Sequence, residues 1–312
     1  MAIMRRDQFR DLVLADALPA LEEVCTDTME EFPMEHEVLY NIRTMTGSIT
    51  QTAQTTGIPA VGTVEEGNDY PLDKMYQGYN KTYTAQKYGV IVPITEELLE
   101  DNEHEEAFDR AVALGRAMRE SQRISAASIF NNAFSDSGPD GVSLCNTAHP
   151  LAYPGAGTTS NALATPADMS LASIEDLVTV MRKTKDQAGK KVLVRPRYVI
   201  VPPELEFLAT ELLDSQSKPQ ASTASNLTEV NAVNAVKSRY GLEVMVMDYL
   251  TDADAFFLAS DKSGHKVKWY WRKQPETSSD MEFKSDVALM KIKARWALGY
   301  SDFRGIAGTP GA

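Results

Sequence analysis

The chain has 312 residues, of which 43% are hydrophobic, and this content is enough for a substantial core and excludes wholesale disorder. Its formal net charge of −13 opposes a tight, sequence-independent grip on nucleic acid, because such binding needs clustered Lys and Arg side chains that displace counterions from phosphates. The sequence contains no run of about 18 apolar residues and no apolar segment behind its first charges, so it predicts neither a membrane-spanning helix nor a secretory signal.

The first predicted element is an amphipathic helix over residues 7–31, in which apolar side chains recur at helical spacing. Pro19 interrupts the pattern, so we expect a kink or two short helices. An amphipathic segment of this kind must lie on its own core or on a neighbouring molecule.

Residues 46–92 are unusually polar. The stretch 46–57 is rich in Thr and Gln, and the stretch 79–88 is rich in Tyr and Thr, which favour β-strands. We interpret the whole as two strands that flank a long polar excursion. Loops beyond about 12–15 residues are uncommon in compact domains and are usually functional or disordered. Two interpretations stay open, namely an arm that lies on another subunit and a long mobile hairpin.

The strongest predicted helix spans residues 93–134. Thr95 is the expected N-cap, the acidic residues that follow complement the helix dipole, and a bend is expected near Asn102. The apolar stripe of this segment is narrow and rich in small residues, which suits a long helix lying across a sheet as a spine. Its members are Phe108, Ala111, Val112, Gly115, Met118, Ala126, Ile129, Phe130, Ala133 and Phe134.

The remainder of the chain alternates between short elements, and it has no internal repeat. Residues 135–170 resemble a loop, and a helix that opens at 166–170 is expected to end near Gly189. Further expected elements are strands at 198–201, 242–247, 255–259 and 267–271, a helix at 204–214 and a polar loop at 215–226. Residues 287–300 have a period of two, which predicts a strand with one buried face. The predicted fold class is α+β.

Familiar catalytic motifs are absent: the sequence has no Gly-rich phosphate loop, nucleophile elbow, His-Glu-x-x-His or calcium loop. We therefore predict no enzyme activity, no cofactor and no metal site. An alternative from another class is a Cys-dependent hydrolase with Cys145 as nucleophile and His149 as base. Such pairs are defined by spatial geometry rather than by a short separation in sequence, so we favour a buried structural Cys145.

Two charged clusters each have two interpretations. The acidic run in residues 96–106 is a cation site or a solvated helix start, and we favour the second. Lys291, Lys293 and Arg295 form a basic stripe that faces an anionic partner or pairs with acids, and we again favour the second.

Aromatic side chains in the polar excursion are the main interface signal, because Tyr is enriched where protein surfaces meet. The residues concerned are Tyr76, Tyr79, Tyr83 and Tyr88. The alternative is that two or three of them pack within the hairpin itself.

The order of these features resembles the major capsid proteins of tailed bacteriophages, which have the Johnson fold. The resemblance is carried by Pro-Ile-Thr-Glu-Glu-Leu-Leu-Glu-Asp at 93–101 before the long helix, and by Asp-Gly-Val-Ser-Leu-Cys-Asn-Thr-Ala-His-Pro at 140–150. The ending at 293–305, with Ala-Phe-Phe-Leu at 255–258, is most similar to Mu-like major head subunits. The resemblance covers nearly the whole chain, and the order of the motifs carries most of its weight.

The resemblance implies a division of the chain into four parts. Residues 1–46 are an N-terminal arm, and residues 47–92 are an extended two-stranded loop that overlaps an adjacent subunit. Residues 93–149 and 266–312 form a peripheral domain with the spine helix. Residues 150–265 form an axial α/β domain, with a loop near 215–230 at the five- and six-fold centres.

The implied function is structural. The chain is expected to assemble with itself, through pentamers and hexamers, into an icosahedral shell that encloses phage double-stranded DNA without sequence-specific binding. The alternative within the same fold is an encapsulin-like nanocompartment shell. Expected partners are a portal, a maturation protease and a scaffold protein, the last being separate because only about 46 residues precede the long loop. The expected location is the virion of a phage or prophage, after synthesis and assembly in the bacterial host cytoplasm, with no membrane partner.

Assembly residues are predicted in two places, the extended loop and the spine helix. They are Lys74, Tyr76, Tyr79, Lys81, Tyr83, Arg116, Arg119 and Arg123. Some relatives join a loop Lys to an Asn of a neighbour. Lys74, Lys81 and Lys87 lie in the corresponding region, but no acceptor Asn is identified, so no cross-link is predicted.

Overall fold

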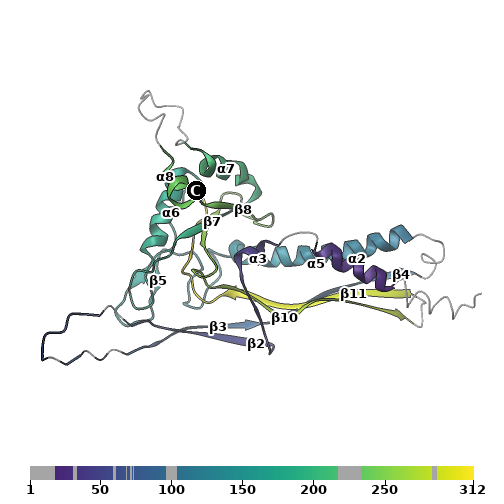
Figure 1. The fold of residues 1–312 in the computed structure, drawn as a ribbon, viewed down its shortest axis with the longest axis horizontal. Coiled ribbons are helices and arrows are strands. Elements are labelled where there is room, and N and C mark those ends of the chain that lie inside the picture. Colours follow the sequence, from purple (N-terminus) through teal and green to yellow (C-terminus); the bar gives the residue numbers. More distant parts are fainter. Residues whose placement is uncertain are drawn as a thin grey trace, which may run out of the picture.

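The computed structural model describes residues 18–30, 34–58, 61–67, 69–70, 72, 74–95, 104–216, 233–282 and 287–312. Helices and strands occur in both halves of the chain, which confirms the α+β class. The molecule is elongated: a long sheet covered by helices forms one part, a second sheet with its own helices stands at one end, and a hairpin extends past that end (Figure 1).

The first sheet has four strands in the order β1-β10-β11-β4. They are β1 (Asn41–Thr44), β10 (Val267–Glu282), β11 (Val287–Tyr300) and β4 (Gln86–Thr95). β1 lies parallel to β10, and the other two pairings are antiparallel. The predicted period of two in β11 is confirmed, because the alternate residues from Ala288 to Trp296 are buried.

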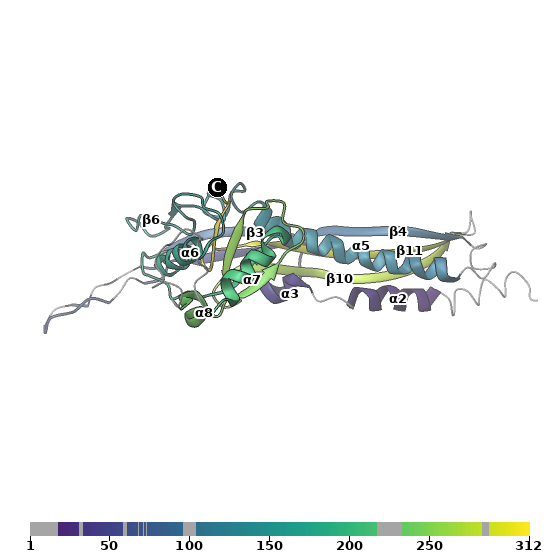
Figure 2. The ribbon, with the colours of Figure 1, turned by 90° about the horizontal axis from the view of Figure 1, so that it is seen from above.

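Three helices cover one face of this sheet, namely α5 (His104–Asn131), α2 (Leu18–Glu30) and α3 (Glu35–Leu39) (Figure 2). The 28 residues of α5 confirm the long spine helix and give it a length of about 42 Å. Its Gly115 lies against α2, and a Cβ there would stand 2.6 Å from the backbone oxygen of Cys25. The missing side chain therefore lets the two helices approach closely.

The start of the spine helix differs from the expectation. The segment Pro93–Thr95 is the end of β4 and pairs with residues 287–289 of β11, so no helix begins at Pro93. Backbone pairing to a neighbouring strand outweighs the local helix signal here. The expected acidic first turn and the bend near Asn102 lie outside the described residues. On the apolar stripe, Phe108 is 39% exposed, whereas Leu114 is buried.

The predicted N-terminal helix is described only in its second part. The structure shows α2 over Leu18–Glu30, whose buried side chains include Leu21 and Cys25. The expected helical residues before Leu18 lie outside the described part of the chain, so the kink or break expected at Pro19 stays a prediction.

The second sheet has the order β12-β9-β7-β8. Its strands are β12 (Ile306–Thr309), β9 (Phe256–Ser260), β7 (Pro196–Val201) and β8 (Glu243–Val246). β7 and β8 are parallel, and the other pairings are antiparallel. This sheet separates two cores, because Ile200 packs in the core of the first sheet whereas Val199 and Val201 pack in the other.

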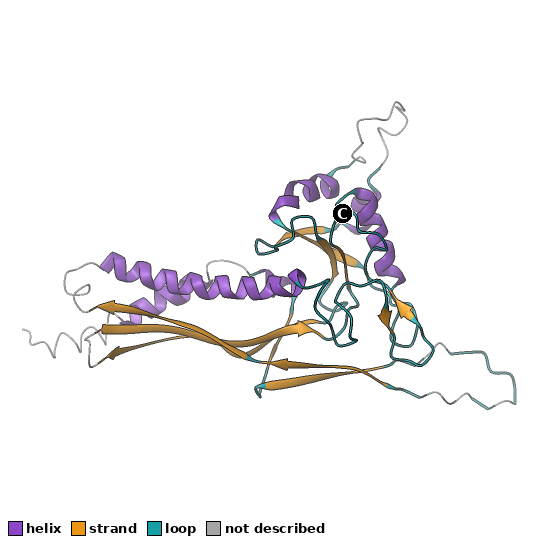
Figure 3. Ribbon diagram, turned by 180° about the vertical axis from the view of Figure 1, so that it is seen from behind, coloured by secondary structure: helices purple, strands orange, loops and turns teal. Residues whose placement is uncertain are grey.

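The helices of the second sheet are α6 (Leu171–Lys183), α7 (Glu206–Asp214) and α8 (Ala235–Tyr240), and a 3₁₀ turn at Pro203–Leu205 precedes α7 (Figure 3). The predicted apolar face of α6 is buried, and Ser170 begins the helix with a capping box. The helix ends at Lys183 rather than at Gly189, which occupies a turn with φ of +81°.

We call the first sheet with α2, α3 and α5 the spine part, and the second sheet with α6, α7 and α8 the apical part. The strand β12 pairs with β9 in the apical part, although residues 266–312 were assigned to the peripheral domain. β4 starts at Gln86 and belongs to the first sheet, although residues up to 92 were assigned to the extended loop. The domain boundaries themselves stay a prediction.

Candidate assembly surfaces

The most prominent surface is the hairpin formed by β2 (Ile49–Thr55) and β3 (Gln77–Thr84), which extends beyond the apical part (Figure 1). The predicted pair of strands around a long excursion is thus confirmed. Apolar side chains beyond the paired strands are more than half exposed. They are Ile58, Val61, Tyr70, Leu72 and Met75. A group of exposed apolar side chains is typical of a surface at which proteins interact.

The hairpin is held against the rest of the chain where its unpaired excursion begins, next to the ends of β2 and β3, and we call this place the hairpin base. There, the backbone N–H of Thr56 donates to the carbonyl of Tyr76 at 2.8 Å and closes the excursion. The Tyr76 ring meets the ring of Tyr153 edge-on, with centroids 5.3 Å apart. The Tyr79 hydroxyl donates to the carbonyl of Pro150 at 3.3 Å. These contacts set the direction in which the hairpin leaves the body.

The four tyrosines predicted as an interface signal divide into two groups. Tyr83 is buried and packs on Tyr270 with centroids 4.8 Å apart, and desolvation raises the pKa of its hydroxyl. Tyr88 belongs to β4 and stacks on Trp296 at 3.8 Å. These two rings therefore support the fold of their own chain. Tyr76 is 40% exposed, and Tyr79 is partly exposed at the hairpin base.

The other predicted assembly residues also differ in exposure. Lys74 and Arg116 are exposed, whereas Lys81, Arg119 and Arg123 are partly buried. Lys81 lies over the ring of Tyr300. Arg119 lines a pocket of about 420 Å³ beneath α2, and desolvation there lowers the pKa of its guanidinium.

Among the described residues, the basic stripe on β11 pairs with an acid only at Lys293, so the favoured interpretation is confirmed only in part. Lys293 lies 3.7 Å from the carboxylate of Glu276 on the adjacent strand β10, and Lys273 pairs with the same carboxylate. Lys291 is exposed. This stripe is at least partly neutralised within the chain.

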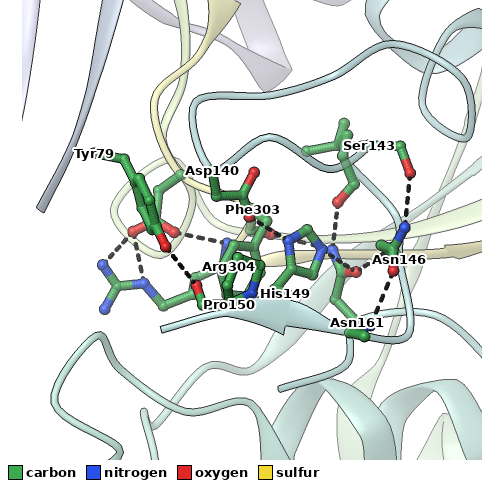
Figure 4. Close-up of polar contacts among 12 residues, drawn as sticks. Tyr79, Asp140, Ser143, Asn146, His149, Pro150, Asn161, Phe303 and Arg304 are labelled. Carbon is green, nitrogen blue, oxygen red and sulfur yellow. Dashed lines mark hydrogen bonds and ion pairs between the residues drawn. The ribbon is translucent and has the colours of Figure 1, made fainter. Parts of the chain in front are cut away.

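Cys145 and His149 are both buried, and they face different neighbours. Burial raises the pKa of the Cys145 thiol, which disfavours the thiolate that a nucleophile requires. The His149 ring places Nδ1 2.6 Å from Asp140 Oδ2 and Nε2 2.9 Å from Asn161 Oδ1, and it stacks on Phe303 (Figure 4). The imidazole is thus engaged on both edges and on one face by groups other than Cys145.

Asn161 is the centre of this buried network, and sequence reasoning did not single it out. Its side chain accepts from the backbone N–H of Asn146 at 2.8 Å and donates to the carbonyls of Leu144 at 2.7 Å and Ile306 at 3.0 Å. With His149 it joins the loop after α5, the turn near β6 (Thr158–Thr159) and the C-terminal strand β12. These hydrogen bonds hold together segments of the chain where the spine part meets the apical part.

Among the described residues, no cluster of three or more His, Cys, Asp or Glu side chains suits a metal ion. In the same part of the chain, no helix is long and apolar enough to cross a membrane.

The comparisons with known proteins agree with these features. A family model described as phage capsid protein matches residues 78–308, which is well over half of the chain. A search of curated proteins finds no match.

Solved structures with a similar fold come from several sources. A capsid structure of the cyanophage P-SCSP1u has a TM-score of 0.59 at 11% identity, over 90% of this chain and 88% of that one. A structure from the Microbacterium phage Oxtober96 has a TM-score of 0.57 at 15% identity, over 89% and 91%. A virus-like particle from Pyrococcus furiosus has a TM-score of 0.54 at 10% identity, over 93% and 98%.

These structural likenesses establish the fold, whereas the family model establishes the family. The fold matches that of phage capsid structures, as the order of motifs in the sequence implied. The chain therefore belongs to the phage capsid protein family and is a structural subunit of a capsid shell.

Proposed function

We propose that this capsid subunit is the major head protein of a tailed phage or prophage, and that its shell is icosahedral and encloses double-stranded DNA. The protruding hairpin carries the proposal. Its apolar side chains have no cover within the described chain, and a single copy has no reason to expose them. Covering the hairpin by an adjacent copy buries that surface. Repetition of the contact around closed symmetry then turns weak interfaces into a stable shell.

Lys74, Tyr76 and Tyr79 are proposed to line this contact, because they lie at the base of the hairpin and are at least partly exposed. Arg116 is proposed for a second contact along the outside of α5. The role of the chain is structural and not catalytic, which agrees with the engaged imidazole of His149 and the buried thiol of Cys145.

The proposed partners are further copies of the chain, a scaffold protein, a portal and a maturation protease. The proposed location is the virion, after assembly in the bacterial host cytoplasm. An encapsulin-like compartment is the alternative within the same fold. The family model favours the phage capsid, because the likeness to the virus-like particle concerns the fold alone.

A shortened hairpin tests the proposal. Residues 57–75 are removed, and Thr56 is joined to Tyr76 through Asn-Gly, a pair of residues that closes a two-residue hairpin turn. The existing hydrogen bond from Thr56 to Tyr76 is then kept at the new turn. We expect a folded, soluble subunit that forms no particles in negative-stain microscopy or light scattering, under conditions in which the unaltered chain assembles.

A milder variant keeps the length of the hairpin. Val61→Ser together with Leu72→Ser removes two of the most exposed apolar side chains and is expected to reduce particle yield without changing the circular dichroism spectrum. Normal particles from the shortened chain would refute the role of the hairpin. Particles that hold a protein cargo and no nuclease-protected DNA would favour the compartment.

A further inference from the structure

The apical part contains a concentrated basic segment in an otherwise acidic chain. Residues 182–197 hold seven of the 31 basic residues and a single acid, Asp186, while the net charge of the chain is −13. The basic residues are Arg182, Lys183, Lys185, Lys190, Lys191, Arg195 and Arg197. Such a concentration calls for a negatively charged counterpart.

Among the described residues, nearby acidic side chains form ion pairs with only one of these seven basic residues. Arg197 pairs with Asp261 at 3.0 Å and with Glu243 at 3.2 Å. Asp186 is taken by Arg304, which comes from the loop before β12. Within the described residues, the remaining six basic side chains of the segment form no ion pair.

Three arginines from different elements meet around one pocket. Arg182 at the end of α6, Arg195 before β7 and Arg239 in the last turn of α8 line a pocket of about 220 Å³. Arg182 donates to the hydroxyl of Tyr240, which lines the same pocket, at 3.0 Å. All three arginines are exposed, and none has an acidic partner among the described residues. We call this surface, together with Lys190 and Lys191, the basic face.

An apolar side chain within the basic face indicates the class of partner. Leu193 lies between Lys191 and Arg195 in the sequence and is 97% exposed. A phosphate backbone offers no apolar surface of its own to cover such a side chain. A protein surface with acids and an apolar neighbour covers both kinds of group, and this favours a protein partner.

The chain itself carries a surface of this description. On α7, Glu206 and Glu211 are exposed and have no basic partner among the described residues, while Phe207 between them is 79% exposed and Leu208 is 38% exposed. We call this the acidic face. In the view of Figure 1, α6 and α8 lie toward the left of the apical part and α7 toward the right, and α7 contacts α8.

We propose that the basic face of one copy binds the acidic face of the next copy in the shell. Two different, complementary surfaces of one subunit form a head-to-tail contact, and such contacts close into rings when the rotation permits. The carboxylates of Glu206 and Glu211 face the arginines and lysines, while Phe207 and Leu193 cover one another's apolar surface. This inference rests on the proposed self-assembly and adds the pair of surfaces that joins neighbouring apical parts.

Charge exchange tests the pairing. The basic-face variant is Lys191→Glu with Arg195→Glu, and the acidic-face variant is Glu206→Lys with Glu211→Lys. Each variant turns attraction into repulsion in every subunit contact, so each is expected to lower particle yield by about tenfold or more. The fourfold variant that carries both changes restores opposite charges across the contact and has the net charge of the unaltered chain. It is expected to recover most of the yield.

The matched control keeps the same net charge but places the new lysines elsewhere. It combines the basic-face variant with Asp27→Lys and Asp109→Lys, two exposed acids on the helices of the spine part. This control is expected to stay as defective as the basic-face variant. Circular dichroism and the thermal midpoint of each unassembled subunit separate lost folding from lost assembly. Where a reversal fails to fold, Lys191→Gln with Arg195→Gln replaces it and is expected to reduce the yield less.

Two outcomes overturn the pairing. The first is particle yield that does not depend on the charges: the basic-face variant or its Gln version assembles as well as the unaltered chain. The same conclusion follows when the fourfold variant recovers no more particle yield than the control. The second is normal shells that retain less DNA, since this would assign the basic face to nucleic acid. In either case, particles from the unaltered chain would leave the proposed shell function standing.

Discussion

Asn161 offers the sharpest test of how the spine part and the apical part are joined. Replacing it with Ala removes the partner of three buried groups, which are the carbonyls of Leu144 and Ile306 and Nε2 of His149, and of the partly buried N–H of Asn146. Each buried polar group that loses its partner costs about 1–3 kcal/mol. Even the lower bound for the three buried groups gives about 3 kcal/mol, which is a large fraction of the roughly 5–15 kcal/mol by which typical domains are stable.

The measurement is urea unfolding of the unassembled subunit, followed by circular dichroism. Asn132→Ala is the control, because Asn132 is exposed and its side chain makes no hydrogen bond among the described residues. Asn161→Asp keeps an acceptor for Asn146 and His149 but places a buried carboxylate oxygen against the carbonyls of Leu144 and Ile306, so it is expected to destabilise the subunit at least as much as Asn161→Ala. A loss below about 1 kcal/mol for Asn161→Ala would show that the network does not brace the junction.

Two further predictions concern buried titratable groups. Burial raises the pKa of Cys25 to about 11 and also raises that of Cys145, so neither thiol should react with a disulfide reagent near about pH 8 until urea unfolds the subunit; fast labelling of the native chain would contradict this. Desolvation lowers the pKa of both His36 and His265 from 6.5 to about 4, so the unfolded chain binds more protons than the folded chain between these values, and stability should fall as the pH falls from about 6.5 to about 4. His36→Gln with His265→Gln should flatten this dependence, and an unchanged slope of unfolding free energy against pH would refute the assignment.

The elements that the sequence predicted best are those with a strong local pattern. β11 alternates between less and more buried positions from Val287 to Trp296, and α6 has a capped start and a regular apolar face. The hairpin was found through its composition, because a long polar stretch without large apolar residues cannot form a core of its own.

The failures have physical reasons. Pro93–Thr95 carries a helix-start signal but gains backbone pairing with β11, which no local pattern contains. β10 extends to Glu282, past the predicted end at residue 271, because polar residues can pair through their backbones just as apolar ones do. β1 and β12, with four residues each, are too short to show a period.

The buried network was beyond sequence reasoning for another reason. Asn161 lies in a Thr/Ser/Asn-rich loop, where polar residues ordinarily face water, and its partners Leu144 and Ile306 are distant in the chain. Only the folded arrangement distinguishes it from the neighbouring polar residues. The basic segment at 182–197 was visible in the sequence, but the surface that we propose as its partner on α7 appears only in the fold, where Phe207 and Leu208 are exposed between Glu206 and Glu211.

The long antiparallel pairing between β10 and β11 is expected to make the subunit stiff along its length. The pairing runs from Val267–Tyr300 to Glu282–Val287, and register irregularities occur only between Trp271 and Glu276. Continuous hydrogen bonding between two strands resists bending. The pair of strands is therefore expected to bend most easily where the pairing is irregular, between Trp271 and Glu276. The stacked and tilted rings of Trp269, Trp271 and Trp296 lie beside it, with centroids 5.4–5.7 Å apart. A wall built from such subunits is expected to bend first at this section of the ladder when it is loaded from inside.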